Sequence, residues 1–545
     1  MSTRRGAWAV FGIALALRLV QVAQVVAHDP FYDHPSVDSL IYVDWAKRIA
    51  AGDWLGHEAF FLSPLYGYLL GAVYALLGPS FLSPLLVNAL LGAGTCALTY
   101  LLAGQLFDLR VALCAGLLAS CYRMEIFYAG APLLEPLQTF LCAAFTWAAL
   151  SALARPSAGR FALAGGLTGL AVLGRQNLLV FALPFALWIP LALRGRESMA
   201  RSARLAGAYL GATLLAIAPA TLHNALAADD FVLVNSTGGI VLYTGWNPEA
   251  NGVYMVPSLF PRALADDPIE QKDAYRALAE QRQGRSLRAS EVSSYWRGQA
   301  LAWAVANPER ALALGLWKAR LFFSAFEAWD VRSETLARPT SKLLRFPLVS
   351  FGVLGPLAFA GIALTAARWR QLVPLYLALA THFATFVVFI ALSRYRVPAL
   401  SALAVFGGVT PVALFEALRQ RRTGRAALGA GVLAVALFAV NFHVPAEDLT
   451  MAHFNLGNAY DQQQDLPNAI AEYSTALRGA PTYLSGWNNL AFAYERSGAD
   501  RELQRQTWKR VLELARAQGS ARHVERATRH LAALAPPPPP LPVPQ

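Results

Sequence analysis

The chain has 545 residues, of which 56% are hydrophobic and only 15% are charged, and its net charge is +12. A soluble protein is about one quarter charged, so this composition excludes a soluble enzyme and predicts a polytopic membrane protein. The positive charge does not indicate nucleic-acid binding, because the basic residues form short clusters between apolar runs. The cysteines lie in or beside apolar runs, with neither disulfide nor metal spacing: Cys96, Cys114, Cys121 and Cys142.

The first apolar run, residues 7–27, follows Arg4 and Arg5 and is predicted to be a retained membrane anchor. The tripeptide VVA at 25–27 also fits a signal-peptidase site, so a cleaved signal peptide is the alternative. Arg18 within the run, together with the odd number of spans that the later loops require, favours retention. Ten further spans are predicted, the shortest of which need neighbours to cross the membrane: 84–106, 111–129, 135–154, 161–174, 176–193, 205–222, 346–367, 372–392, 397–417 and 426–443.

Arginines recur in every second loop between these eleven spans, which identifies those loops and the N-terminus as cytoplasmic. The sequence therefore predicts a multi-pass protein of the cell inner membrane with three extracytoplasmic parts. These are a first loop at 28–83, a large loop at 223–344 and everything after residue 443. The arginine-rich loops contain Arg110, Arg155 with Arg160, Arg194 with Arg196, Arg201 and Arg204, Arg368 with Arg370, and Arg419 with Arg421, Arg422 and Arg425.

The first extracytoplasmic loop carries the strongest candidate site. Between Asp29 and Tyr66 it is rich in acidic and aromatic residues, although apolar runs flank it on both sides. Asp38, Tyr42 and Trp45 are spaced i, i+4 and i+7, so they share one face of a helix. Asp44 falls away from that face. This pattern predicts a catalytic carboxylate at Asp38.

Two apolar helices outside the spans, at 63–78 and 309–326, are predicted to be membrane-surface or re-entrant helices, because counting either as a span would invert the later loops. His28, His34 and His57 lie near acidic residues, but their spacing fits no standard ligand pattern. We therefore expect no metal cofactor.

The tail after residue 443 has the tetratricopeptide period of 34 residues. The first repeat covers 450–481, and its contact residues recur in the second with about one inserted residue. We predict a repeat domain at 444–535 with a capping helix near 521–534, followed by a disordered proline-rich tail at 536–545. Such repeats bind proteins or peptides of many kinds.

The membrane part resembles a known family in the order and sidedness of its motifs. The motifs are ALRLV at 16–20, Asp38 to Tyr42, GDW at 52–54, Pro64 to Tyr66, Leu134 to Leu137, Gly174 to Asn177, Ala218-Pro219, His223-Asn224, Asn235 to Gly239, Gly245 to Pro248 and Arg394 to Arg396. In this order they are similar to the GT-C glycosyltransferases of the family 39 type, which include protein O-mannosyltransferases and bacterial aminoarabinose transferases. The resemblance covers about residues 7–420, so we expect a transmembrane glycosyltransferase domain over 1–443 with an all-α, GT-C-like fold.

This resemblance implies transfer of a sugar from a polyprenyl-phosphate donor to an acceptor hydroxyl on the outer face, with inversion at the anomeric carbon. It places Asp38 as the general base, because the hydroxyl needs a carboxylate within hydrogen-bond reach. The leaving group is a phosphate anion that cations must meet, and the candidates are Arg394, Arg396, Arg175 and Lys318. The candidates for binding the acceptor or the sugar are Tyr42, Asp44, Glu135 and Asn247. The expected partners are the lipid-linked sugar, the bilayer and a protein or peptide at the repeats.

The sequence departs from the family at two points. Many relatives have Asp-Glu in the first loop, whereas Ser39 follows Asp38 here, and Phe61-Leu62-Ser63 stand where aminoarabinose transferases place a lysine before the proline. The alternative function is therefore a non-catalytic scaffold whose repeats organise an envelope assembly complex. A transporter is disfavoured, because the charges cluster outside the spans and no inverted repeat is visible.

Overall fold

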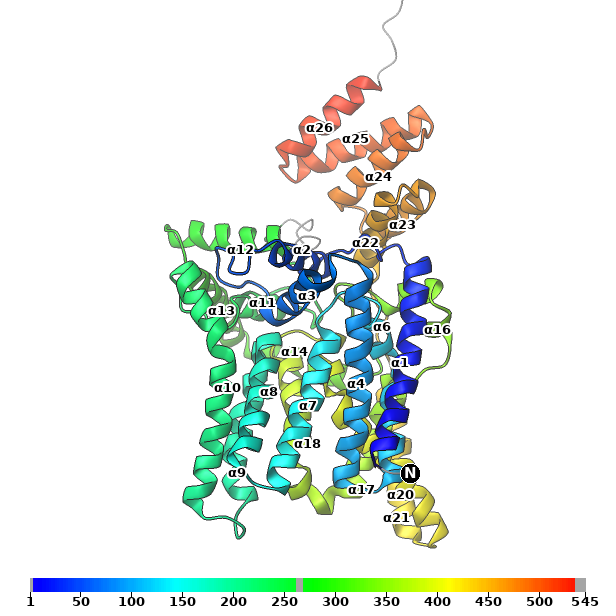
Figure 1. The fold of residues 1–545 in the computed structure, drawn as a ribbon. Helices are drawn as coiled ribbons and strands as arrows, with labels where there is room; N and C mark the ends of the chain where they lie inside the picture. Colours follow the sequence, from blue (N-terminus) through cyan, green and yellow to red (C-terminus); the bar gives the residue numbers. More distant parts are fainter. Residues whose placement is uncertain (1–2, 261–267, 535–545) are drawn as a thin grey trace, which may run out of the picture.

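The protein is built from helices, as the computed structural model in Figure 1 shows. The structure describes residues 3–260 and 268–534. Within these ranges the only β pairing consists of two isolated bridges, Tyr122–Val349 and Arg194–Glu197. The all-α fold class predicted from the sequence is confirmed.

Seven segments in the described ranges are long and apolar enough to cross a membrane. They are α1 (Thr3–His28), α4 (Leu82–Leu106), α7 (Glu135–Ala154), α10 (Met199–Ala228), α17 with α18 (Phe351–Thr365 and Trp369–Val388), α19 with α20 (Ser393–Arg396 and Leu400–Arg419) and α21 (Thr423–Asn441). Four further apolar helices are shorter: α3 (Pro64–Leu77), α5 (Leu109–Ser120), α8 (Ala158–Gly174) and α9 (Leu179–Ala192) with its preceding 3-10 turn. The prediction of a polytopic membrane protein is confirmed, although three of its eleven predicted spans correspond to these shorter helices.

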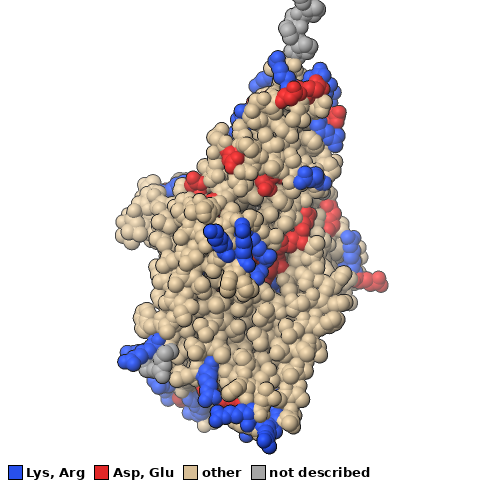
Figure 2. All heavy atoms as spheres, turned by 90° about the vertical axis from the view of Figure 1, so that its right-hand side faces the viewer, with Lys and Arg blue, Asp and Glu red and all other residues tan. Residues whose placement is uncertain are grey.

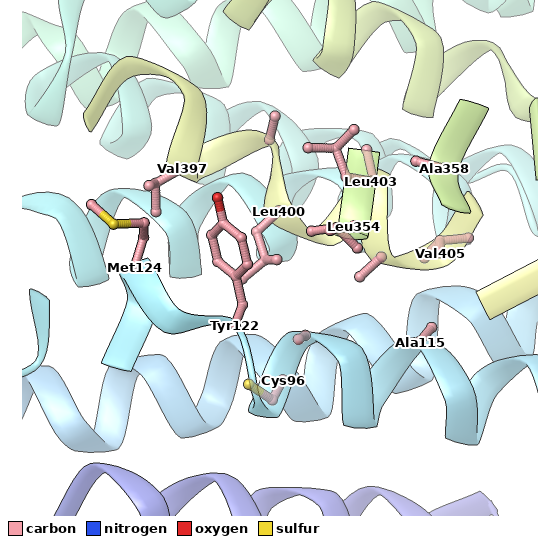
Figure 3. Close-up of a cluster of buried hydrophobic side chains, with 14 of the residues drawn as sticks. Cys96, Ala115, Tyr122, Met124, Leu354, Ala358, Val397, Leu400, Leu403 and Val405 are labelled. Carbon is pink, nitrogen blue, oxygen red and sulfur yellow. The ribbon is translucent and has the colours of Figure 1, made fainter. Parts of the chain in front are cut away.

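The predicted span at 111–129 is interrupted for a visible reason. Helix α5 ends at Ser120 and α6 (Arg123–Tyr128) begins only after a break. At the break the backbone bonds to another segment, since Arg123 N donates to Val349 O at 2.9 Å and Val349 N donates to Cys121 O at 3.0 Å. Figure 3 shows Tyr122 at this point, within the buried apolar cluster that α20 and α17 complete.

Small residues let α8 and α10 approach closely. A Cβ atom on Gly165 would stand 2.0 Å from Tyr209 O, and one on Gly169 would stand 2.5 Å from Thr213 O. The Thr213 hydroxyl donates to Gly165 O at 3.0 Å across this contact. Glycines four residues apart are typical of tightly packed membrane helices, because they remove the side chains that would separate the two backbones.

The first and large loops form a cap on the end of the bundle opposite the N-terminus (Figure 1). The first loop contributes α2 (Asp38–Ala50) and leads into α3. The large loop contributes α11 (Gly238–Gly245), α12 (Pro268–Gln283), α13 (Ala289–Ala306), α14 (Pro308–Phe323), α15 (Glu334–Ala337) and α16 (Lys342–Arg345). In Figure 2 a broad face with few charged side chains separates basic residues at the lower end from mixed charges above, as expected of a surface that faces lipid.

The tail folds into five helices above this cap: α22 (Thr450–Gln462), α23 (Leu466–Gly479), α24 (Leu484–Arg496), α25 (Arg501–Ala517) and α26 (Ala521–Ala533). Gly457 in α22 permits close packing on the Tyr473 ring of α23, 2.6 Å from where its Cβ would be. The module contacts both extramembrane loops. Trp329 Nε1 donates to Asp448 O at 2.9 Å, and the Gln463 amide donates to Asp33 at 3.3 Å. The predicted proline-rich tail at 536–545 lies outside the described residues.

Candidate functional site

A cavity of about 180 Å³ lies where the cap meets the bundle. Its polar side chains come from segments far apart in the sequence, namely the start of α2, the start of α7, the turn after α8, the large loop and α19. These residues are Asp38, Tyr42, Ser63, Glu135, Arg175, Thr237, Thr244, Tyr254, Gln271, Asp330, Arg394 and Tyr395. The cavity therefore joins the first loop, where the sequence predicted the site, to four other segments.

Arg394 is the centre of the site. Its Nη1 lies 2.8 Å from Asp38 Oδ2, and its Nε lies 2.8 Å from Asp330 Oδ2. All three side chains are largely buried, with exposed fractions of 20%, 15% and 12%. Asp38 is the first residue of α2, where the helix dipole favours a negative charge. Two carboxylates from two loops thus share one guanidinium.

Burial and the neighbouring charges affect the pKa of Asp330. Burial raises the pKa of this carboxyl, and the negative charge of Asp38 raises it further, while Arg394 opposes both effects. The net direction is upward, so Asp330 binds a proton more readily than a free aspartate does.

A second ion pair lies on another wall of the cavity. Arg175 Nη2 donates to Glu135 Oε1 at 2.6 Å, and the guanidinium stacks 4.7 Å from the centre of the Tyr395 ring. Arg394 lies 5.8 Å from the same ring centre. The second oxygen of Glu135, Oε2, is buried and has no hydrogen-bond partner within the described part of the chain. Arg175 and Arg394 therefore flank one aromatic ring, each with an acid beside it.

The structure does not bring two of the predicted phosphate-binding residues into the cavity. Lys318 is buried, its Nζ donates to Gly245 O at 2.8 Å and to Phe389 O at 2.7 Å, and burial lowers its pKa to about 7. Arg396 is also buried and donates to four backbone carbonyls, those of Leu321, Phe322, Ser324 and Phe326, while it pairs with Glu327 at 2.8 Å. Both cations hold backbone segments together.

Among the predicted acceptor-binding residues, Tyr42 and Glu135 line the cavity and two others do not. Asp44 lies on the outer side of α2 and pairs with Lys47 at 3.1 Å. Asn247 is buried, and its amide donates to Tyr243 O and Thr244 O at 3.0 Å each, which caps the end of α11. As the helical pattern predicted, Asp44 does not share the face of α2 that carries Asp38 and Tyr42. The geometry therefore does not support Asp44 as an acceptor-binding residue.

Sequence reasoning missed Asp330, Tyr254 and Gln271, which the large loop contributes. Gln271 Nε2 donates to the Tyr254 hydroxyl at 2.7 Å. The segment that carries Asp330 is anchored two residues further on, where Arg332 pairs with Asp29 just after α1 and donates to Gly130 O at 3.2 Å. None of these residues belongs to a periodic pattern, so only their place in the large loop could have suggested them.

The comparisons with known proteins agree with the family suggested by the sequence. Residues 62–223 match the family model for dolichyl-phosphate-mannose-protein mannosyltransferases. Residues 457–498 match the model for the tetratricopeptide repeat. The predicted resemblance is therefore confirmed for these two parts of the chain. No curated protein matches the chain.

Solved structures give similarities at low identity. The chain is similar to ArnT from Cupriavidus metallidurans bound to undecaprenyl phosphate, at 15% identity and a TM-score of 0.43, over 93% of this chain and 80% of ArnT. It is also similar to the oligosaccharyltransferase AglB from Archaeoglobus fulgidus in complex with an inhibitory peptide and a dolichol-phosphate, at 14% identity and a TM-score of 0.42. That match covers 84% of this chain, which spans only 59% of the length of AglB.

Proposed function

We propose that the protein is an inverting membrane glycosyltransferase that moves a sugar from a polyprenyl-phosphate donor to an acceptor hydroxyl. The observation that carries this proposal is the buried Arg394, which lies between Asp38 and Asp330 and beside Arg175 in one cavity. A base and a pair of cations are the groups that such a transfer requires. The family match over residues 62–223 agrees with this chemistry.

The proposed mechanism begins with an exchange of partners at Arg394. When the donor phosphate enters, Arg394 turns toward it from Asp38, which frees the Asp38 carboxylate to accept the acceptor's proton. The acceptor oxygen then forms a bond to the anomeric carbon as the bond from that carbon to the phosphate oxygen breaks. The electron pair leaves with the polyprenyl phosphate, whose new charge is stabilised by Arg394 and Arg175.

The acids beside these arginines offset their positive charge and preserve the geometry of the site. Asp330 stays paired with the Nε of Arg394 while Nη1 moves from Asp38 to the donor phosphate, so the cation stays in the cavity throughout. Glu135 orients Arg175 through Oε1, and its unpaired Oε2 is available to accept a hydrogen bond from a sugar hydroxyl. Tyr42, on the same face of α2 as Asp38, contacts the sugar or the acceptor.

The repeat domain is proposed to bind a protein or peptide, either the acceptor or a partner that delivers it. The repeat domain contacts the segments that lead into the cavity, since Gln463 bonds to the first loop and Trp329 bonds to the start of the tail. The protein is proposed to lie in the cell inner membrane with its N-terminus on the cytoplasmic side. The cavity and the repeats then both face the extracytoplasmic side.

A donor panel tests the proposal. Purified full-length protein in lipid nanodiscs receives radiolabelled polyprenyl-phosphate sugars and an envelope extract as the acceptor source. The double variant D38N/R394Q removes one negative and one positive charge together and provides the background. Transfer by the wild type above this background supports the enzyme. Absence of transfer with every donor, from a protein whose repeats still capture an envelope partner, would instead support the non-catalytic scaffold.

A further inference from the structure

A second cavity lies at the other end of the bundle, the end that carries the N-terminus, far from the proposed active site (Figure 1). It measures about 1050 Å³ and lies between the ends of α4, α7 and α9 and the start of α18. Every charged side chain that lines it is an arginine: Arg155, Arg160, Arg194, Arg196, Arg368 and Arg370. The cavity thus presents six positive charges and no negative charge on its wall.

These arginines are not neutralised by acids in the described part of the chain. The acid nearest in sequence, Glu197, pairs with Arg201 at 3.0 Å and does not line the cavity. Arg196 donates to Leu153 O at 3.0 Å and Ala154 O at 3.1 Å, so its side chain is anchored on the end of α7 with its charge unpaired. An excess of positive charge held on a concave wall favours an anion.

The remaining wall is apolar and aromatic. Trp188 and Trp369 lie with ring centres 6.2 Å apart, and the Trp188 indole N–H is buried without a hydrogen-bond partner in the described ranges. Trp147 and Leu150 extend the lining along α7, and Trp147 lies about 10 Å from the helix end at Ala154. A basic rim that continues into an apolar wall suits an amphipathic anion.

We propose that this cavity binds the phosphate headgroup of an anionic phospholipid, whose acyl chains follow the apolar wall. The tendency of arginines to gather on one side of a membrane explains their presence at this end. This tendency does not explain why six arginines line one cavity, because Arg419 and Arg422 follow the same tendency and do not line it. The inference stands independently of the proposed transferase activity.

Lipid binding to two matched variant pairs tests this site. Delipidated full-length protein in phosphatidylcholine nanodiscs is titrated with cardiolipin, and the bound lipid is counted by native mass spectrometry. R194Q/R370Q removes two cavity arginines, and R419Q/R422Q removes two arginines of the same end outside it. Each arginine near a lipid phosphate contributes about fivefold in affinity, so the cavity pair should bind about 25-fold more weakly while the control pair binds like the wild type. The variant R194K/R370K should retain binding.

Three results would overturn the assignment: equal weakening in both pairs, unchanged binding in the cavity pair, or complete displacement of cardiolipin by inorganic pyrophosphate, which would indicate a site for soluble anions. A second variant tests the proposal independently, in case R194Q/R370Q does not fold. Leu191 lines the cavity with 59% of its surface exposed, so Leu191→Glu keeps every arginine and adds a carboxylate to the wall. It should also weaken cardiolipin binding, and unchanged affinity would contradict the proposal.

Discussion

The variant Arg394→Gln probes the arrangement on which the proposed mechanism depends. It removes the cation that lies 2.8 Å from both Asp38 and Asp330, whose side chains are 15% and 12% exposed. Breaking a buried ion pair by removing one partner costs about 3–5 kcal/mol, because an uncompensated charge stays buried. Loss of the cation that meets the leaving phosphate should also reduce kcat by about 10²–10³. The surface pair Arg285–Glu291, 56% and 37% exposed, supplies a control, since Arg285→Gln should leave the stability nearly unchanged.

The effect of Arg394→Gln on stability should depend on pH with a defined sign. Burial already raises the pKa of Asp330, and removing Arg394 takes away the charge that opposes this rise. The folded variant then binds more protons than its unfolded chain does, so its stability should fall as the pH rises above about 4, the ordinary pKa of an aspartate.

The assay compares thermal unfolding and transfer for the wild type, R394Q, D330N and the double variant. Asp330→Asn should restore part of the stability that R394Q loses, with a coupling of at least about 1 kcal/mol, but it should not restore transfer. A coupling of zero, or an R394Q protein as stable and active as the wild type, would refute the reasoning.

Two further predictions concern residues outside the cavity. Lys318, whose pKa burial lowers to about 7, binds fewer protons when folded than when unfolded, so the stability of the wild type relative to Lys318→Met should rise from pH 7 toward pH 10. Thermal unfolding across that pH window checks this, and a flat difference would contradict it. Gly165→Ala should destabilise the protein by about 1–3 kcal/mol, because its Cβ would meet Tyr209 O. A Cβ on Gly166 would have no neighbouring atom within 4 Å, so Gly166→Ala should be neutral or slightly stabilising in the same unfolding assay. Equal changes in stability for the two variants would disprove the contact between α8 and α10.

The membrane fold was largely predictable because its signal is local. A run of apolar residues predicts a span by its length alone, and the repeat period identified the tail from residues that recur 34 positions apart. The interruption at 121–122 was not predictable in this way, because the Val349 backbone that pairs with it comes from a distant segment.

The cavity was predictable only in part. Asp38 and Tyr42 share a helical face that the sequence displays, and both line the cavity. Asp330 has no such signal, because its place depends on a pair with Arg394 and on the nearby Arg332–Asp29 pair, both of which join distant segments. Lys318 has the charge of a phosphate-binding residue, but backbone carbonyls occupy its ammonium group. Charge and approximate depth therefore identify candidates, and tertiary contacts decide which of them face the cavity.

The most direct test of the account is the single-turnover rate of transfer by Asp38→Asn, measured with a donor that the panel identifies. The control is Asp53→Asn, which alters an exposed aspartate of the same loop that accepts a hydrogen bond from Gly56 N at 2.9 Å. The account predicts that Asp38→Asn lowers the rate by about 10²–10⁴, the contribution of a general base, while Asp53→Asn transfers at the wild-type rate. Wild-type rates in a folded Asp38→Asn protein would contradict the assignment of the base.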